Sequence, residues 1–304
     1  MNNGFFTIDK PAGITSHDVV SRVRRILGTA KAGHTGTLDP FATGVLPVGV
    51  NEGTKAIPYL NEGVKCYEAL LRFGVVTDTL DMTGAVLSEA DPSGITCSRL
   101  ASCLTEFTGA ISQIPPMYSA IKQNGQQLYK LARKGMDIER KARNVEIHSI
   151  ELLAFDLPYA AVRIVCSRGT YIRSLADDIG RTLGCGAALQ ELRRTASGPF
   201  RIEEAVTLQD LEIAAGEGRE GALCLSTMAA LDHLPDIPLT AGGAEGLRFG
   251  RSPSWNATLL ETPVSCPTAT VVRLTSGGKL AAVATLVPGR GADTAIVLKR
   301  VFID

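Results

Sequence analysis

Residues 33–48 read GHTGTLDPFATGVLPV, a glycine-rich loop that carries one histidine, His34, and one aspartate, Asp39, ahead of an apolar run. Glycine lets the backbone approach a ligand closely, and Pro40 directs the preceding Asp39 toward extended geometry. An aspartate in such a loop can present its carboxylate to a substrate. Two simpler interpretations stay open, because Asp-Pro is a common turn pair and because the G-x-x-G at 33–36 also occurs in KH domains.

Regular structure is predicted on both sides of this loop. A first strand is expected over residues 4–8, and the chain leaves it at Lys10 and Pro11. Ser16 is the expected N-cap of a helix that runs to about Leu27. The loop itself, over residues 29–43, should be irregular. Further strands are expected at 44–50, 64–73, 84–87, 145–155 and 160–166, and helices at 97–107, 126–133 and 170–183, the last one capped by Gly184.

Strands and helices mixed in this way indicate the α+β fold class, with a central mixed, mostly antiparallel sheet. After about residue 235 the composition changes, and residues 237–304 consist of short strand-like runs broken by Gly and Pro. We therefore expect two domains, a large one over residues 1–236 and a small β-rich one over residues 237–304.

The composition excludes several classes of protein. The longest apolar run, residues 280–287, is far shorter than the ~18 residues that a membrane helix needs, and the opening MNNGFFTIDKP does not resemble a secretion signal. The seven cysteines are odd in number and include no C-x-x-C pair, which argues against a disulfide framework or a structural zinc site. These features predict a cytoplasmic protein without a membrane segment.

Charge is unevenly distributed along a chain whose net charge is zero, from 31 basic and 31 acidic residues. Zero net charge argues mildly against binding to nucleic acid. However, residues 122–143 carry seven basic side chains against two acidic ones, which is compatible with a local site for a polyanion or, alternatively, with a solvated face. The seven basic residues are Lys122, Lys130, Arg133, Lys134, Arg140, Lys141 and Arg143.

Several further motifs accompany the loop at 33–48. They are KPAGITS at 10–16, KCY at 65–67, GVVTDTLD at 74–81, IPPMYSAIK at 114–122, CSRGTYIRSL at 166–175, and LRR at 192–194 followed by GPF at 198–200. Together and in this order, over about residues 4–210, they resemble the motifs of the TruB family of pseudouridine synthases. The resemblance implies the pseudouridine synthase fold and an enzyme that isomerises uridine to pseudouridine in RNA.

The resemblance also implies the catalytic residues. Asp39 stands at the position of the family's catalytic aspartate. Its ordinary pKa of about 3.9 already leaves it ionised at neutral pH, and an adjacent arginine, Arg173, would favour the charged form further. Tyr67 would stack on the uracil and help to remove the C5 proton, and Leu192 would form an apolar wall. From the residues alone two alternatives stay open: Tyr67 packed along a strand, and Arg173 paired with Asp177 one helical turn on.

The implied substrate is the T-arm stem-loop of transfer RNA, with the target at position 55 in the T-loop. A base within a folded loop must be flipped out, which costs about a few kcal/mol, and His34 would fill the vacated space. Histidine titrates near neutrality, so a general base is the alternative for His34. Lys10 would contact the RNA backbone or support the loop around Asp39. An insertion at about 113–143 would grip the RNA phosphates. Its contacts would come from Lys122, Lys130 and Arg133.

No cofactor is expected, because the isomerisation needs neither a redox change nor an outside group. We expect a monomer that acts without an obligatory protein partner and without a metal. The sequence LRFG at 247–250 resembles a motif of PUA domains, which are small RNA-binding barrels. The C-terminal domain is therefore expected to be PUA-like, with any other small β domain as the alternative.

Three other functions are alternatives to a stand-alone pseudouridine synthase. An RNA-guided member of the same family works inside a ribonucleoprotein, but the chain has no Lys-rich tail. A non-catalytic RNA-binding or RNA-folding protein would not need Asp39, Tyr67 and Arg173 together. A metal-dependent nuclease or phosphatase needs clustered carboxylates and histidines, and only Asp78 and Asp81 lie near a motif.

Overall fold

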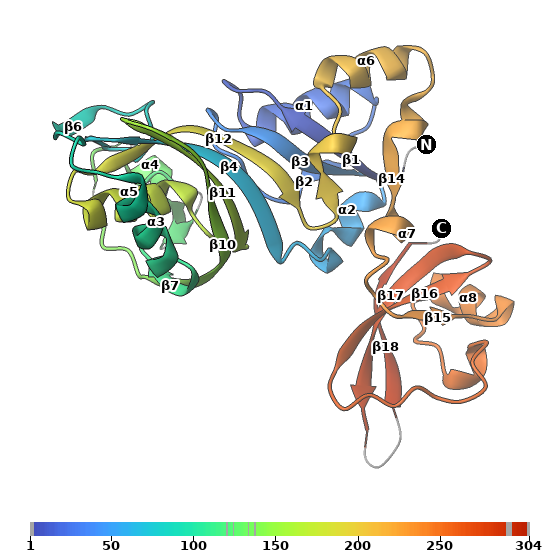
Figure 1. Cartoon of the computed structure of the whole chain (residues 1–304). Helices are drawn as coiled ribbons and strands as arrows, with labels where there is room; N and C mark the ends of the chain where they lie inside the picture. Colours follow the sequence, from blue (N-terminus) through green and yellow to red (C-terminus); the bar gives the residue numbers. More distant parts are fainter. Residues whose placement is uncertain are drawn as a thin grey trace.

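The computed structural model describes residues 3–119, 121–123, 125–132, 134–136, 138–289 and 294–302. Two main sheets organise this part of the chain, a large one between Gly4 and Ser226 and a small one nearer the C-terminus (Figure 1). Within the described residues, no helix is both long enough and apolar enough to cross a membrane.

The large sheet forms the body of the large lobe. Its strands are β1 (Gly4–Lys10), β2 (Ala32–His34), β3 (Thr43–Val50), β4 (Val64–Phe73), β7 (Gly109–Gln113), β10 (Arg143–Asp156), β11 (Tyr159–Ser167), β12 (Ala187–Ser197), β13 (Phe200–Arg201) and β14 (Cys224–Ser226). Their order is β14-β1-β3-β12-β4-β11-β10-β7, with β2 added to β3 and β13 to β12. In the described chain only the pairing of β12 with β3 is parallel in this sheet, which confirms the predicted α+β class with a mixed, mostly antiparallel sheet. Strand β2 lies inside the loop that the sequence predicts to be irregular.

Strand β12 lies at the centre of this sheet, yet the sequence pattern does not predict it. Its Arg194 is fully buried, so the strand lacks the alternation of apolar and polar residues that identifies strands. The guanidinium donates from Nε to the carbonyl of Val45 at 2.7 Å and from Nη2 to that of Gly36 at 3.1 Å. Strand β3 can approach β12 because Gly44 has a φ of +98°, and a Cβ there would lie 2.2 Å from the Arg194 carbonyl oxygen.

Helices pack on the large sheet at both of its ends (Figure 1). At one end, α3 (Cys97–Glu106) and α5 (Ile172–Leu183) pack against each other, α3 also against β10 and α5 against β12. At the other end, α1 (Ser16–Ile26) packs on α6 (Leu208–Gly216). One continuous apolar core runs beneath all four helices, so the two ends form one unit.

The N-cap of α1 is Thr15, so the prediction of Ser16 is wrong by one residue. The Thr15 hydroxyl accepts a hydrogen bond from the N–H of Asp18, whose carboxylate accepts one from the Thr15 N–H, which makes a capping box. Ser16 therefore becomes the first helical residue, and its hydroxyl is available to the loop that carries Asp39. Helix α5 ends at Gly184 as predicted, with a φ of +87° that suits a left-handed C-cap.

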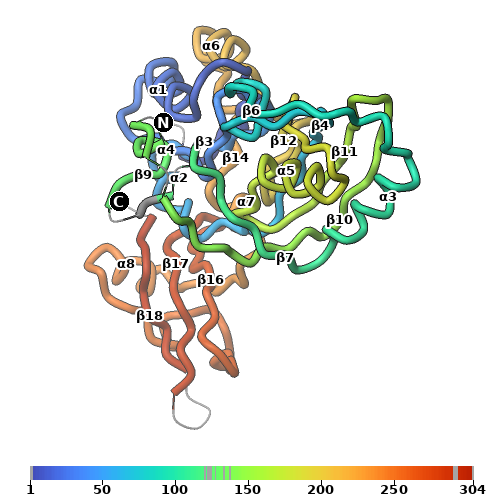
Figure 2. Tube along the Cα trace, turned by 90° about the vertical axis from the view of Figure 1, so that its left-hand side faces the viewer, coloured from blue at the N-terminus to red at the C-terminus, as the bar shows by residue number. Residues whose placement is uncertain are grey.

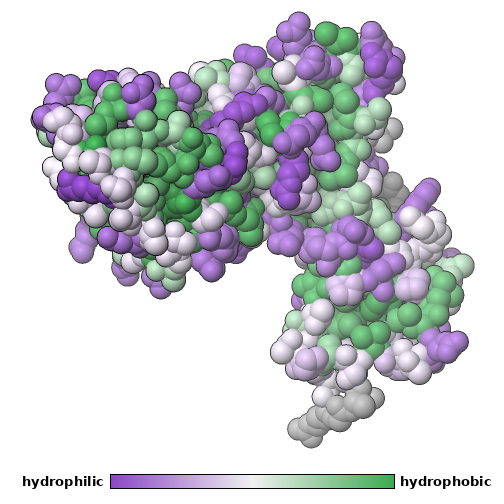
Figure 3. Space-filling model, in the orientation of Figure 1, coloured by the Kyte–Doolittle hydropathy of each residue, from purple (hydrophilic) through white to green (hydrophobic). Residues whose placement is uncertain are grey.

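The small sheet has its own apolar core. Its strands, in spatial order, are β15 (Asp236–Pro238), β16 (Thr270–Ser276), β17 (Lys279–Pro288) and β18 (Thr294–Val301), and α8 (Ala241–Arg248) packs on them. Leu280 and Val283 of β17 also pack into an apolar cluster with Phe5 and Phe200 of the large lobe. The small lobe therefore projects from one end of the large lobe through a packed junction (Figure 3).

The predicted insertion between β7 and β10 contains little regular structure. A ribbon of β8 (Lys122–Gln123) and β9 (Gln126–Gln127) precedes α4 (Leu128–Ala132), which is shorter than the helix predicted over 126–133. The N–H of Leu128 donates to the carbonyl of Ile121 at 2.8 Å, which ties the segment to its root. Figure 2 shows β9 and α4 set to one side of the molecule, away from α5.

Candidate active site

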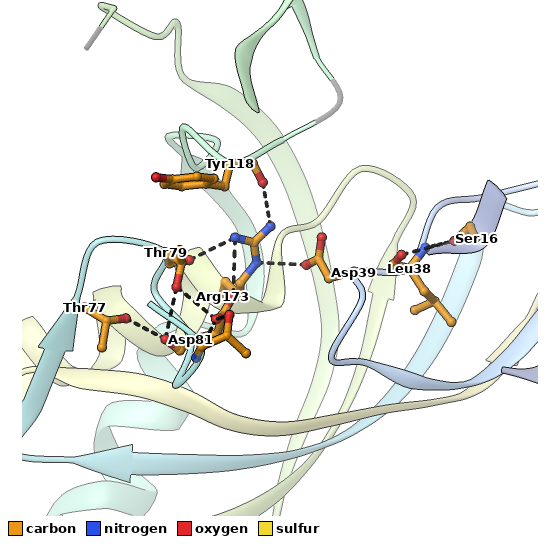
Figure 4. Close-up of polar contacts among 9 residues, drawn as sticks. Ser16, Leu38, Asp39, Thr77, Thr79, Asp81, Tyr118 and Arg173 are labelled. Carbon is orange, nitrogen blue, oxygen red and sulfur yellow. Dashed lines mark hydrogen bonds and ion pairs between the residues drawn. The ribbon is translucent and has the colours of Figure 1, made fainter. Parts of the chain in front are cut away.

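Asp39 lies in the loop between β2 and β3, and the start of α1 holds that loop in place (Figure 4). The Ser16 hydroxyl accepts a hydrogen bond from the N–H of Leu38 at 2.9 Å and donates one to the carbonyl of the same residue at 3.1 Å. On the other side of Asp39, the N–H of Gly13 donates to the carbonyl of Pro40 at 2.8 Å. The carboxylate is therefore presented by a backbone that is anchored on both sides.

Lys10 supports the same loop from inside the protein. Its side chain is completely buried, and Nζ donates to the carbonyls of Pro11 at 2.9 Å, Pro40 at 3.1 Å and Ala42 at 2.7 Å. Burial lowers the pKa of Lys10 to about 8, against the opposing effect of the Asp39 charge. Three backbone carbonyls occupy this buried ammonium, and contact of Lys10 with RNA stays a prediction. The geometry agrees with the alternative, support of the Asp39 loop.

Arg173 reaches Asp39 from the first turn of α5 (Figure 4). Its Nε lies 2.9 Å from Oδ2 of Asp39, and its two other nitrogens donate to the carbonyls of Thr79 at 2.9 Å and Tyr118 at 2.8 Å. Only 4% of the Arg173 side chain is exposed, so these charge-assisted bonds form largely away from water. The structure thus brings together two residues that the motifs place far apart in the sequence.

A second carboxylate, that of Asp81, shares Arg173 with Asp39. Its Oδ2 lies 3.6 Å from Nη1 of Arg173, and its Oδ1 accepts hydrogen bonds from the hydroxyls of Thr79, at 2.9 Å, and Thr83. Asp81 is buried, and its place beside Arg173 is the part of this site that the sequence did not predict. The GVVTDTLD motif was the available signal, but it suggested Asp81 only as a metal ligand because nothing along the chain shows which residue the carboxylate faces.

The alternative pairing of Arg173 with Asp177 does not occur. Oδ2 of Asp177 instead lies 2.9 Å from Nη2 of Arg181, one turn further along α5. Helical spacing allows both pairs, so the orientation of α5 on the sheet decides between them: Arg173 faces the loop that carries Asp39.

The paired Asp39 and Arg173 line a cavity of about 340 Å³, which we call the active-site cavity. Tyr67 of β4 and Leu192 of β12 line the same cavity, and both are largely buried. A larger cavity of about 570 Å³ borders Asp177, but neither Asp39 nor Tyr67 lines it. Because the four residues predicted to act on the base meet in the smaller cavity, we identify that one as the candidate active site.

Burial raises the pKa of the Asp39 carboxyl above its ordinary value, although 34% of the side chain remains exposed in the cavity. Arg173 opposes this rise and Asp81 adds to it. The sequence suggests only the lowering effect of the arginine, because burial is not visible along the chain. Burial also raises the pKa of the Tyr67 phenol, so Tyr67 is protonated at neutral pH.

His34 and Lys130, two of the residues predicted to contact RNA, do not line this cavity. His34 is half-buried in β2, and burial lowers the pKa of its imidazole, which favours the neutral form. Lys130 is exposed on α4. Arg133 and the side chain of Lys122 lie outside the described residues. The roles of all four in RNA binding stay predictions.

Comparison with known proteins gives the family. Residues 24–172 match "TruB family pseudouridylate synthase (N terminal domain)", and residues 173–233 match "tRNA pseudouridylate synthase B C-terminal domain". The chain belongs to the TruB family. This TruB-family chain is 51% identical to the tRNA pseudouridine synthase B of Geotalea uraniireducens, over 93% of this chain and 91% of the relative, and 49% identical to that of Geobacter sulfurreducens, over 94% of each. The TruB-family chain is therefore a pseudouridine synthase, as its motifs indicate.

Solved structures agree with this assignment. The fold of the TruB-family chain is similar to one chain of a Cbf5-Nop10-Gar1 complex, with a TM-score of 0.76 and 28% identity over 99% of this chain and 85% of the other. A chain of an H/ACA RNP bound to a substrate RNA containing 2′-deoxyuridine gives a TM-score of 0.75 and 26% identity, over 99% and 85%. The similarity extends over both lobes of the TruB-family chain.

Proposed function

We propose that the chain converts uridine 55 in the T-loop of transfer RNA to pseudouridine, with Asp39 as the reacting carboxylate. The observation that carries this proposal is the contact of 2.9 Å between Arg173 Nε and Asp39 Oδ2 in a cavity lined by Tyr67 and Leu192. The relatives, which are tRNA pseudouridine synthases B, support transfer RNA as the substrate.

The reaction breaks the bond between uracil N1 and ribose C1′, turns the base, and joins C5 to C1′. The proton on C5 leaves to solvent and N1 gains one, so atoms and electrons balance without a cofactor. Asp39 has three routes: addition to C6, attack at C1′, or removal of a proton from C2′. Each route needs the ionised carboxylate. The raised pKa of Asp39 makes that carboxylate a stronger base and nucleophile, and Arg173 favours its charged form.

The other cavity residues would position the base. Tyr67 would stack on the uracil, and Leu192 would close the opposite side as an apolar wall. Because the Tyr67 phenol is protonated at neutral pH, it can accept the C5 proton only late in the reaction and only if another group takes the phenolic proton. His34, neutral and half-buried in β2, would fill the space that the flipped uridine leaves.

Binding of the RNA would extend beyond the cavity. The insertion at 113–143 would contact the T-arm phosphates through Lys122, Lys130 and Arg133. We propose that the chain has a catalytic domain over residues 1–236 and a PUA-like RNA-binding domain over residues 237–304. We also propose that it acts in the cytoplasm as a monomer without an obligatory protein partner. The separate core of the small lobe supports the two-domain division.

The proposal is tested with an unmodified transfer RNA transcript. After incubation with the purified protein, carbodiimide adducts on pseudouridine are mapped by primer extension. A new stop one nucleotide 3′ of position 55, absent when that uridine is replaced by cytidine, is the expected result. Modification at another uridine, or tight binding without any modification, would contradict the proposed substrate position or the proposed activity, respectively.

A further inference from the structure

Lys65 lines the active-site cavity, yet the reaction described above gives it no role. It lies two residues before Tyr67 on β4, so both side chains project from the same face of the strand. Its strand neighbours are Cys166 of β11 and Ser197 of β12. Its ammonium reaches the turn at Gly36, where a Cβ would lie 2.6 Å from Lys65 Nζ. The absence of a side chain on Gly36 therefore leaves room for this ammonium.

The Lys65 ammonium makes no hydrogen bond or ion pair with the described residues, although the carboxylate of Glu62 is near enough to influence it. The Glu62 carboxylate instead accepts hydrogen bonds from the hydroxyls of Thr35 and Ser197. Burial, and after it the guanidinium of Arg194, together lower the pKa of Lys65 to about 8. A half-buried cation without a partner is unfavourable, so the site is suited to an added anion.

More positive charge surrounds Lys65 than negative charge. The guanidinium groups of Arg168 and Arg194 both act on it, against the single carboxylate of Glu62. Arg168 is exposed and, within the described part of the chain, its guanidinium has no recorded partner. Residues 169–170, which follow it, line the cavity, and their N–H groups donate to no carbonyl in the described segments. Positive charge and unused donors without an acceptor are the features of an oxyanion site.

We propose that Lys65 and Arg168 bind a phosphate of the RNA backbone, in a phosphodiester next to the target uridine. The depth of the residues supports this placement. Tyr67 and Leu192, which would hold the base, are largely buried, whereas Lys65 is half-buried and Arg168 is exposed. A nucleotide with its base between the buried residues leaves its phosphates toward the exposed ones. This inference rests on the proposed function, because the same nucleotide carries both groups.

The test removes the charge from each partner separately. Two T-arm stem-loops each carry one neutral methylphosphonate, on the 5′ or the 3′ side of the target uridine, and kcat/KM is measured for the parent protein and for Lys65→Met. At one of the two positions the neutral group lowers kcat/KM of the parent by about tenfold, as expected for one lost charge-assisted contact. Lys65→Met lowers kcat/KM about as much with the ordinary RNA. The two changes combined lower it little further, because they remove the same contact.

If the loss of kcat/KM from Lys65→Met multiplies with the loss from the methylphosphonate at both positions, the two changes act independently. That result would overturn the phosphate site. Lys55→Met is the matched control, because Lys55 pairs with Glu52 at 2.7 Å outside the cavity, and it should change neither result. If thermal unfolding shows that Lys65→Met does not fold, Lys65→Gln replaces it. The slope of log KM against log salt concentration should then fall by about 0.7–0.9 for one lost phosphate contact, and an unchanged slope would overturn the proposal.

The same assay distinguishes a failure of the phosphate site from a failure of the proposed function. If the parent protein does not convert the ordinary stem-loop, the proposed function itself fails. If the parent converts it and the effects of Lys65 and the phosphate are independent, only the phosphate site fails.

Discussion

Arg173→Met should weaken both the fold and the reaction, and the size of each effect follows from the contacts of the guanidinium. The substitution removes the ion pair with Asp39, the weaker contact with Asp81 and two hydrogen bonds to backbone carbonyls. Removing one partner from a buried ion pair costs about 3–5 kcal/mol. Because the Asp39 side chain is 34% exposed, water screens part of its charge, and we expect the lower end, about 3 kcal/mol.

The loss of stability should depend on pH in a defined direction. Arg173 opposes the burial effect, so without it the folded-state pKa of Asp39 rises further above the unfolded value of about 3.9. A carboxyl with a raised folded-state pKa destabilises the protein when it is ionised, and this penalty decreases as pH falls through the folded-state pKa. Urea unfolding of Arg173→Met should therefore show a larger deficit relative to the parent at pH 7 than at pH 5.

Activity is measured as release of tritium from uracil C5 over a range of pH. With Arg173→Met, kcat should fall by about 10²–10³-fold, and the acidic limb of the profile should move to higher pH because the ionised form of Asp39 becomes rarer. Arg163→Met is the control: Arg163 pairs on the surface with Glu68 and Glu151, and the three side chains are 44%, 43% and 61% exposed, so only a marginal loss of stability and no shift of the acidic limb are expected. An unchanged acidic limb, together with a loss of stability that does not depend on pH, would show that Arg173 does not control the ionisation of Asp39.

Two further substitutions test the scaffold. Lys10→Met leaves three carbonyl oxygens without their donor and should lower the free energy of unfolding by about 3 kcal/mol, measured in urea; an unchanged midpoint would show that the loop does not depend on Lys10. Gly44→Ala should cost more than about 2 kcal/mol, because φ is +98° and a Cβ would lie 2.2 Å from a carbonyl oxygen of β12. Gly216→Ala, in α6 with open space around it, is its control and should be neutral or slightly stabilising.

Features determined by local sequence were predictable. Strand β4 has the predicted bounds, because glycines at 63 and 74 flank Val64–Phe73 and because apolar residues recur at alternate positions, at 67, 69, 71 and 73. Helix α5 ends at Gly184 because a left-handed C-cap favours glycine. The loop of Asp39 was recognisable because glycines and a proline restrict its backbone within a few residues.

Features determined by contacts between distant segments were not predictable. Strand β12 contains a buried Arg194, whose partners are carbonyls of β3 and of the turn at Gly36. The Asp81 carboxylate lies beside the Arg173 guanidinium, and the Lys10 ammonium donates hydrogen bonds to two carbonyls that follow Asp39. Each of these polar groups gains the partners named here only after the sheet has assembled, so neither residue type nor spacing along the chain reveals them.

The central claim is that Asp39 is the reacting carboxylate, and its substitution by asparagine tests this claim most directly. Asp39→Asn keeps the shape of the side chain and removes its charge. Asp78→Asn is the matched control, because Asp78 is exposed, accepts a hydrogen bond from the N–H of Ala85, and does not line the active-site cavity. Both variants and the parent are incubated with transfer RNA that carries tritium at uracil C5.

We predict that the parent and Asp78→Asn release tritium at similar rates and that Asp39→Asn releases none above background while it still binds the RNA. Release by Asp39→Asn at the rate of the parent would leave the activity in place and contradict the assignment of Asp39 as the reacting group.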